Sequence, residues 1–238
     1  MPELWGVIPA AGIGQRMQSA IPKQYLSLHG KTLLQHSCER LLALDAVCGL
    51  VVAVRDDDPH WPAVADALTA DASKPVITVS GGDERADSVC HALQRLMAMR
   101  HRSAPVWVLV HDAVRPCVRA ADMERLIDGA RGNEPHGALL AMPVRDTMKR
   151  ADGEGRVSAT VAREQLWHAL TPQCFPLPVL YQALQQAAEQ GLSVTDESSA
   201  MEHAGYRPLL VPGAEDNIKV TRPHDLGLAE RNLSEQLS

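Results

Sequence analysis

The sequence predicts an α/β protein with a doubly wound, mostly parallel twisted sheet and a protruding β-hairpin arm. Short apolar runs alternate with longer segments of helical spacing, which is the strand–helix–strand order of parallel sheets. The apolar runs are continuous, as expected for strands covered on both faces. One polar stretch after Pro143 breaks this rhythm. We therefore expect a single domain over residues 1–238, with an arm at about 144–163.

Five apolar runs are the expected strands of the first part of the chain: Leu4–Ile8, Gly49–Val54, Val76–Ser80, Val106–Val110 and Ala138–Met142. Three segments between them carry apolar residues at helical spacing and are expected helices: Thr32–Leu44, Ala86–Met99 and Ala120–Arg131.

The polar stretch is expected to form the arm. Asp146–Arg150 and Arg156–Val161 flank a turn at Asp152–Gly155 and can pair as a hairpin. Because such a hairpin has little apolar surface to bury, we expect it to project from the domain.

Helical spacing returns at Leu177–Gln190 and at about Asp196–His203. Two further strands are expected, at Leu209–Val211 and Asn217–Val220. The last helix should begin at Thr221-Arg222-Pro223, with Thr221 as its N-cap and the proline in the first turn.

Composition excludes several function classes. An aromatic content of 3% disfavours a stacking platform for single strands, and a formal net charge of -6 disfavours a broad nucleic-acid-binding face. The chain has neither a signal peptide pattern nor ~18 consecutive apolar residues, so we expect no membrane partner. Its five cysteines form no CxxC pair, and we expect buried free thiols in a cytoplasmic protein.

The loop after the first expected strand has the composition of a phosphate cradle. Its small residues are Pro9, Ala10, Ala11, Gly12 and Gly14. They let the backbone N–H groups approach an anion closely. A Rossmann dinucleotide fingerprint needs a third glycine where this chain has Met17, and a Walker A loop needs one at Tyr25. A plain strand–helix turn remains the alternative.

Two basic residues follow this loop and favour phosphate chemistry. Arg16 supplies a planar cation and Lys23 a mobile point charge, and together they suit the transition state of a phosphoryl transfer. Either residue alone would also fit a solvated surface charge.

The segment Gly81–Val89 follows a strand and opens a helix. Gly82 permits close approach of a ligand, and Asp83 and Ser88 offer polar atoms for a base or a ribose. A glycine-rich turn before a capped helix is the alternative interpretation.

Asp112, Ala113 and Arg115 follow the expected strand Val106–Val110, at the edge where open α/β sheets bind ligands. Asp112 is a candidate ligand for Mg²⁺, with other divalent cations possible, and Arg115 is a candidate phosphate ligand. A structural Asp112–Arg115 pair is the alternative. We expect His111 to orient its neighbours and not to act in catalysis.

These motifs resemble a known family. The relevant segments are Pro9-Ala10-Ala11-Gly12-Ile13-Gly14-Gln15-Arg16-Met17 and Pro22-Lys23-Gln24-Tyr25. Together they resemble the opening signature of the 2-C-methyl-D-erythritol 4-phosphate cytidylyltransferases, a branch of the sugar-nucleotide pyrophosphorylase superfamily. The similarity runs in order and spacing from Leu4 to about Glu230, with Val114 as a departure where the family usually has alanine.

The resemblance implies a Rossmann-like nucleotidyltransferase fold and a specific reaction. CMP would pass from CTP to 2-C-methyl-D-erythritol 4-phosphate, with release of pyrophosphate, in isoprenoid precursor biosynthesis by the non-mevalonate pathway. It further implies Mg²⁺ as cofactor and a homodimer that exchanges arms.

The resemblance also implies roles for residues. The catalytic residues would be Arg16, Lys23, Arg163 and Lys219. The acceptor-binding residues would be Arg115, Thr147, Thr171 and Thr195, with Arg115 reaching from a neighbouring subunit. The nucleotide-binding residues would be Pro9, Ala10, Ala11, Gly12, Gly14, Gly82, Asp83, Ser88, Asp112 and Ala113.

Two other functions remain open on the residues alone. One is a cytidylyltransferase for another polyol phosphate, such as ribitol 5-phosphate. The other is a non-catalytic nucleotide-binding protein, which would not need the transition-state cations Arg16 and Lys23.

Overall fold

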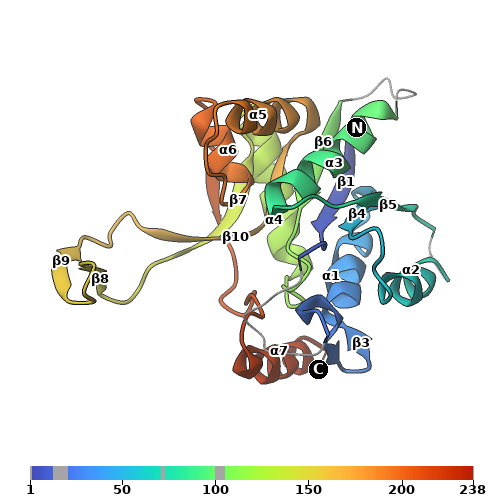
Figure 1. Ribbon diagram of the computed structural model, residues 1–238, viewed down its shortest axis with the longest axis horizontal. Helices are drawn as coiled ribbons and strands as arrows, with labels where there is room; N and C mark the ends of the chain where they lie inside the picture. The colour runs from blue at the N-terminus through green and yellow to red at the C-terminus, as the bar shows by residue number, and fades with distance from the viewer. Residues whose placement is uncertain (1, 13–20, 71–72, 100–104, 238) are drawn as a thin grey trace.

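The computed structural model describes residues 2–12, 21–70, 73–99 and 105–237 (Figure 1). Within these ranges the main sheet has seven strands in the order β11-β7-β10-β6-β1-β4-β5. Their bounds are β1 Glu3–Pro9, β4 Val47–Val54, β5 Val76–Ser80, β6 Val106–Val110, β7 Ala138–Pro143, β10 Trp167–Pro176 and β11 Leu209–Pro212. All neighbouring pairs are parallel except those of β10, which runs antiparallel to β6 and β7. The predicted mostly parallel sheet is confirmed.

Helices cover both faces of this sheet, so the doubly wound prediction is also confirmed. On one face, α1 (Leu33–Leu42), α2 (Trp61–Thr69) and α4 (Ala120–Gly132) share a core with Leu4 and Ile8 of β1. On the other face, α3 (Arg85–Ala98), α5 (Leu177–Glu189) and α6 (Glu197–His203) share a core with Trp5 and Val7. Successive residues of a strand point to opposite faces, so one apolar run serves two cores.

The C-terminal helix closes one end of the molecule. Ala229 and Leu233 of α7 (Pro223–Leu237) pack in a third cluster with Leu28, Leu33 and Val114. A short 3₁₀ helix η2 (Lys23–Tyr25) and the two-stranded sheet of β2 (Ser27–Leu28) and β3 (Lys31–Thr32) precede α1. Within the described ranges, no helix has both the length and the apolar character required to traverse a bilayer.

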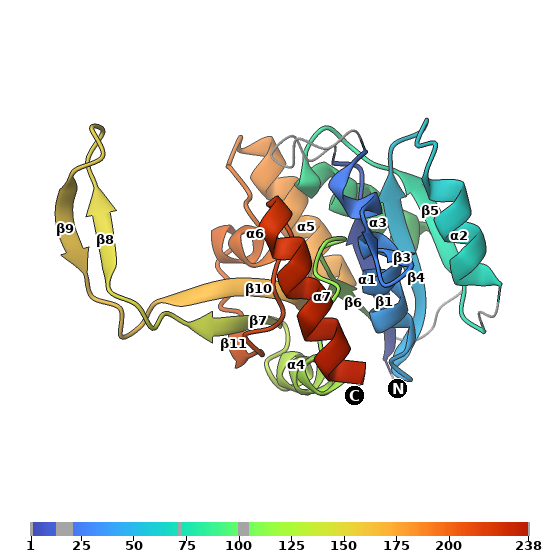
Figure 2. The ribbon, with the colours of Figure 1, turned by 90° about the horizontal axis from the view of Figure 1, so that it is seen from below.

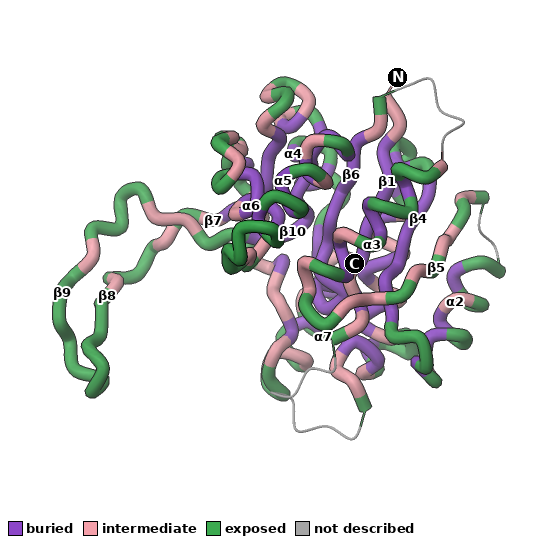
Figure 3. Tube along the Cα trace, turned by 45° about the horizontal axis from the view of Figure 1, so that its top comes forward, coloured by how far each residue is buried: buried purple, intermediate pink, exposed green. Residues whose placement is uncertain are grey.

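The expected arm is present. β8 (Met148–Ala151) and β9 (Val157–Val161) pair as an antiparallel hairpin. Figures 1 and 2 show this hairpin extending away from the main sheet, and Figure 3 shows it as mostly exposed, in contrast to the buried central strands.

Two expectations about the C-terminal part are wrong. Asn217–Val220 is a loop and not a strand, anchored by the Val220 N–H donating to Val114 O at 2.9 Å. Thr221 is not the N-cap of the last helix, because α7 begins at Pro223 after Arg222. Instead, Asp225 reaches back from the first turn, and its Oδ2 accepts hydrogen bonds from the Thr221 N–H and hydroxyl and from the Arg222 N–H.

Besides the short elements η2, β2 and β3, the strand β10 and the helix α2 were not predicted from the sequence. β10 contains Pro172, which cannot donate a ladder hydrogen bond, and its pairing with β7 is irregular between Ala169 and Gln173. Because this stretch is not a continuous apolar run, the sequence pattern does not indicate a strand here. α2 is short, although its buried residues Trp61, Val64 and Leu68 do have helical spacing.

The prediction of buried thiols holds only in part. All five cysteines are free, and Cys38, Cys117 and Cys174 are buried. Cys48 is exposed and Cys90 is partly buried. Cys48 takes the one exposed position of β4, near the start of the strand.

Candidate active site

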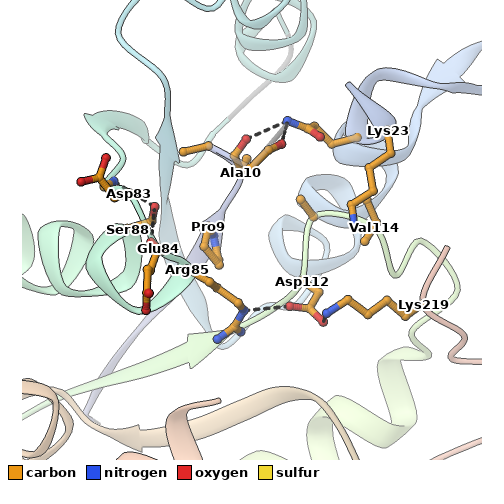
Figure 4. Close-up of a pocket in the computed structure, with 15 residues that line it drawn as sticks. Pro9, Ala10, Lys23, Asp83, Glu84, Arg85, Ser88, Asp112, Val114 and Lys219 are labelled. Carbon is orange, nitrogen blue, oxygen red and sulfur yellow. Dashed lines mark hydrogen bonds and ion pairs between the residues drawn. The ribbon is translucent and has the colours of Figure 1, made fainter. Parts of the chain in front are cut away.

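A cavity lies at the carboxyl ends of β1, β5 and β6, which the doubly wound topology brings to one edge of the sheet (Figure 4). Residues from five segments of the chain line it: the loop Pro9–Gly12, Lys23 with Gln24, Gly82–Arg85 with Ser88, Asp112–Val114, and Lys219. It therefore combines the predicted phosphate loop with Lys23, Asp112 and Lys219. Gly14 and Arg16 lie outside the described residues.

The side chain of Gln24 holds the loop in place. Gln24 is buried, and its amide nitrogen donates to Ala10 O at 2.9 Å and to Gly12 O at 3.0 Å. The Ala10 N–H donates to Ala53 O at the end of β4, at 2.7 Å. The loop is thus fixed from both sides. Sequence reasoning assigned Gln24 no role, although it lies in the run that carries the family resemblance.

Glycine allows two loops of the cavity to touch. A Cβ atom at Gly81 would lie 2.2 Å from the Cβ of Ala11, which is far inside contact distance. The Gly81 N–H donates to Val54 O at 2.7 Å, and the Gly82 N–H donates to Ser88 Oγ at 3.0 Å. Asp83, in contrast, is exposed at the cavity rim.

Asp112 follows β6 directly and is surrounded by three cations. Its Oδ1 accepts from Arg85 Nε at 3.1 Å, and its Oδ2 lies 3.3 Å from Arg115 Nε and 3.0 Å from Lys219 Nζ. Burial acts to raise the pKa of this carboxyl, but Arg85, Lys219 and Arg115 outweigh burial and hold the pKa well below its usual value. Asp112 is therefore ionised at neutral pH.

Arg85 is also held by a second carboxylate. Its Nη1 and Nη2 donate to the two oxygens of Glu197 at 2.6 and 3.0 Å. Glu197 is the first residue of α6 and is 1% exposed. Burial acts to lower the pKa of Arg85, but Glu197 and Asp112 raise it above its usual value. Sequence reasoning missed both residues, because nothing local links positions 112 residues apart.

A second cavity adjoins the first. It is lined by Arg85, Asp112, Arg115, Ala169, Leu170, Thr171, Gln173, Thr195, Asp196 and Lys219. Three predicted acceptor-binding residues, Arg115, Thr171 and Thr195, are thus brought together with Lys219. Arg115 is buried within this same chain, where its Nη1 donates to Asn217 O at 2.7 Å. Arg85, Asp112 and Lys219 line both cavities and form their common wall.

Two predicted site residues lie elsewhere. Thr147 and Arg163 are exposed and belong to the arm, and the guanidinium of Arg163 donates to the backbone oxygen of Arg145. A single chain therefore does not bring them to either cavity.

His111 orients its neighbours behind the site. Its Nε2 lies 3.0 Å from Arg115 O, which only accepts, so Nε2 carries the proton. Nδ1 then accepts from the Thr171 hydroxyl, whose oxygen accepts from the Asp112 N–H. Burial lowers the pKa of His111 to about 4, so the ring is neutral at pH 7.

Comparison with known proteins gives a consistent result. A family model described as 2-C-methyl-D-erythritol 4-phosphate cytidylyltransferase matches residues 4–235. The protein of that name from Vibrio atlanticus is 50% identical over 229 residues, which cover 96% of this chain and 94% of that protein. Its namesake from Pseudomonas putida is 51% identical over 227 residues, with coverage of 95% and 94%.

Solved structures are similar as well. The crystal structure of a 4-diphosphocytidyl-2C-methyl-D-erythritol synthase matches with a TM-score of 0.82 at 35% identity, covering 98% of this chain and 99% of that one. The 2-C-methyl-D-erythritol 4-phosphate cytidylyltransferase of Francisella tularensis matches with a TM-score of 0.80 at 32% identity, with coverage of 97% and 99%.

Proposed function

This chain belongs to the 2-C-methyl-D-erythritol 4-phosphate cytidylyltransferase family, and from that premise we propose how its two adjoining cavities carry out the reaction. The enzyme transfers CMP from CTP to 2-C-methyl-D-erythritol 4-phosphate. The products are 4-diphosphocytidyl-2-C-methyl-D-erythritol and pyrophosphate, and the reaction belongs to isoprenoid precursor biosynthesis.

One observation carries the assignment of the cavities. The cavity with the glycine-containing loop and the cavity with Arg115, Thr171 and Thr195 share a wall. We assign CTP to the first and the acceptor phosphate to the second. Substrates bound in two adjoining cavities lie next to each other, and this proximity removes much of the entropic barrier of a bimolecular step.

The chemistry requires charge neutralisation and no general base. The acceptor is a phosphate monoester with about -1.5 to -2 charges near neutral pH, and it is already a nucleophile. One of its oxygens attacks the α-phosphorus of CTP in line, and the bond from that phosphorus to the bridging oxygen of the β-phosphate breaks. The electron pair leaves with pyrophosphate. The obstacle is repulsion between two polyanions, which positive side chains must overcome.

The described residues supply such charge. Around Asp112 and Glu197, the three cations Arg85, Arg115 and Lys219 leave one positive charge in excess. Lys219 is 37% exposed at its side chain and can reach a phosphate in either cavity. Lys23 also lines the nucleotide cavity, on the side away from Asp83 and Ser88 (Figure 4). We assign Lys23 and Arg16 to the α-phosphate and Lys219 to the acceptor phosphate.

Gly82, Asp83 and Ser88 are assigned to the cytidine end of the nucleotide. The backbone beside Gly82 can approach a flat base closely, and its carbonyl oxygens suit the exocyclic amine of cytosine. The small loop residues Pro9, Ala10, Ala11 and Gly12, with Ala113 opposite, take the rest of the nucleotide.

Magnesium fits the site as part of the nucleotide substrate. Among the described residues, no group of three or more His, Cys, Asp or Glu side chains is placed to hold a metal ion. Both oxygens of Asp112 are paired with cations. Mg²⁺ commonly takes one or two carboxylates together with substrate phosphates. Mg²⁺ would therefore be held chiefly by the phosphate oxygens of CTP, where it would offset their negative charge, and Asp112 is the buried carboxylate that could also contact it.

The arm supports a homodimer. Thr147 and Arg163 are exposed on an arm that leaves its own domain. If these residues contact the acceptor, they must come from a second copy of the chain. A cytoplasmic location is proposed as well, since all five thiols are free.

The test is an assay of pyrophosphate release with purified protein, Mg²⁺, CTP and 2-C-methyl-D-erythritol 4-phosphate. UTP and ribitol 5-phosphate serve as comparison substrates. Turnover that needs both CTP and the methylerythritol phosphate supports the proposal. Equal use of UTP would refute the cytosine assignment, and CTP binding without any pyrophosphate would indicate a non-catalytic binding protein.

A further inference from the structure

We propose that Arg85, anchored by Glu197, is a positioning residue that holds Asp112 so that Lys219 stays available to the acceptor phosphate. The proposal rests on the function proposed above and adds two residues to that site. Neither residue is among the catalytic or binding residues predicted from the sequence.

Arg85 uses each of its three guanidinium nitrogens. Nη1 and Nη2 bind the two oxygens of Glu197, and Nε binds Asp112 Oδ1. The planar fork fixes the angle between these bonds, so the position of Glu197 dictates where Asp112 Oδ1 must lie. Figure 4 shows the Arg85 side chain extending from α3 toward Asp112 across the cavity.

The anchor itself is rigid. Glu197 begins α6, and the preceding Asp196 caps this helix by accepting from the Ser199 N–H at 3.0 Å. Gln173 of β10 donates to Asp196 Oδ2 at 2.8 Å and accepts from the Ser198 N–H at 2.8 Å. The first turn of α6 is thus tied to the central sheet, and Glu197 is buried between them.

Arg85 determines how the two oxygens of Asp112 are shared among the neighbouring cations. Arg85 occupies Oδ1, which leaves Oδ2 for Arg115 and Lys219. When Lys219 turns to a phosphate, two arginines still neutralise the buried carboxylate. Without Arg85, Asp112 would depend on Lys219 for much of its compensation. An incoming phosphate would then compete with Asp112 for the lysine, and acceptor binding would weaken.

A purely structural role makes a different prediction. Removing one partner of a buried ion pair is strongly destabilising because the other charge is left uncompensated, whereas replacing both partners with apolar residues is often tolerated. If Arg85 only stabilised the fold, the double variant Arg85→Met/Glu197→Leu would match the wild-type enzyme in both stability and activity. If Arg85 positions Asp112, the double variant would match the wild type in stability but not in acceptor binding.

The experiment compares this double variant, Arg85→Lys and the control Arg95→Met with the wild-type enzyme. Arg95 is exposed on the same helix. Thermal unfolding reports folding, and steady-state pyrophosphate release gives kcat and KM for each substrate. We expect the control to match the wild type. In the double variant, KM for 2-C-methyl-D-erythritol 4-phosphate should rise roughly tenfold or more, while KM for CTP and kcat stay within about threefold.

Arg85→Lys separates charge from geometry. A lysine keeps the charge but cannot bridge two carboxylates at fixed angles, so it should also raise the acceptor KM. A wild-type acceptor KM in Arg85→Lys or in the folded double variant would overturn the proposal, as would an equal rise in KM for CTP. If the double variant does not fold, the acceptor KM of Arg85→Lys decides between a positioning role and a purely structural role for Arg85. A wild-type enzyme without turnover would instead refute the proposed function.

Discussion

Replacing Gln24 with alanine should weaken CTP binding by loosening the loop Ala10–Gly12. The Gln24 amide donates to Ala10 O at 2.9 Å and to Gly12 O at 3.0 Å, and the side chain is buried. In the variant, both carbonyl oxygens lose their partner. The loop then spends less time in the conformation that forms the nucleotide cavity.

The magnitude follows from the two hydrogen bonds. Each contributes about 1 kcal/mol net, so their loss favours other loop conformations by about 2 kcal/mol. Because the apparent affinity falls with the fraction of molecules in the competent conformation, Kd for CTP should rise by up to roughly 30-fold. Gln24→Glu should be at least as harmful at pH 8, since a carboxylate of the same shape meets two carbonyl oxygens and cannot donate to them.

Calorimetric titration with CTP, together with KM from pyrophosphate release, measures the effect. Gln182→Ala provides a matched control, because Gln182 is an exposed glutamine on α5. Thermal unfolding would show whether the variant remains folded. A Kd within about threefold of the wild-type value in folded Gln24→Ala would refute the reasoning, because the loop would then hold its conformation without these bonds.

Three further outcomes are expected. Lys23→Ala should still fold but lower kcat by roughly 10²–10³, or about 3–4 kcal/mol, and near-normal turnover would exclude its assigned role. Gly81→Ala should raise KM for CTP, since the new Cβ would lie 2.2 Å from the Cβ of Ala11; Gly153→Ala, where a Cβ meets nothing, is the control. The folded-state pKa of His111 is about 4, below the unfolded value, so stability should rise by about 2 kcal/mol from pH 5 to about pH 6.5 in urea titrations. That slope should flatten in His111→Gln, and identical slopes would contradict the buried, neutral ring.

Much of the fold could be read from local patterns. Continuous apolar runs such as Leu4–Ile8 and Val106–Val110 specify strands buried on both faces, and β1 and β6 lie there. The polar hairpin could be placed because it lacks apolar residues to bury. β10 escaped prediction because Pro172 and its polar neighbours interrupt the pattern, and the sheet tolerates them at an irregular pairing.

The predicted site residues depended on a similar argument. Strand ends of a parallel sheet meet at one edge, so the loop after β1 and the segments after β5 and β6 could be expected to form one cavity. The side-chain contacts within this cavity could not be predicted from the sequence. Gln24 reaches back to the loop, Lys219 comes to Asp112 from a loop near the C-terminus, and Glu197 binds Arg85 from 112 positions away.

Local spacing could be predicted and the contacts of the site could not, because the two depend on residues at very different separations along the chain. Helical or strand spacing expresses backbone geometry over a few residues, and it is visible in any window of the sequence. A carboxylate that is buried away from water needs a cation beside it. The packing of whole helices and strands decides which cation that is. Amino-acid order therefore specified most strands of the sheet, the small-residue loop after β1 and the arm, and the packing of α3 and α6 on the sheet selected Arg85 as the link between Asp112 and Glu197.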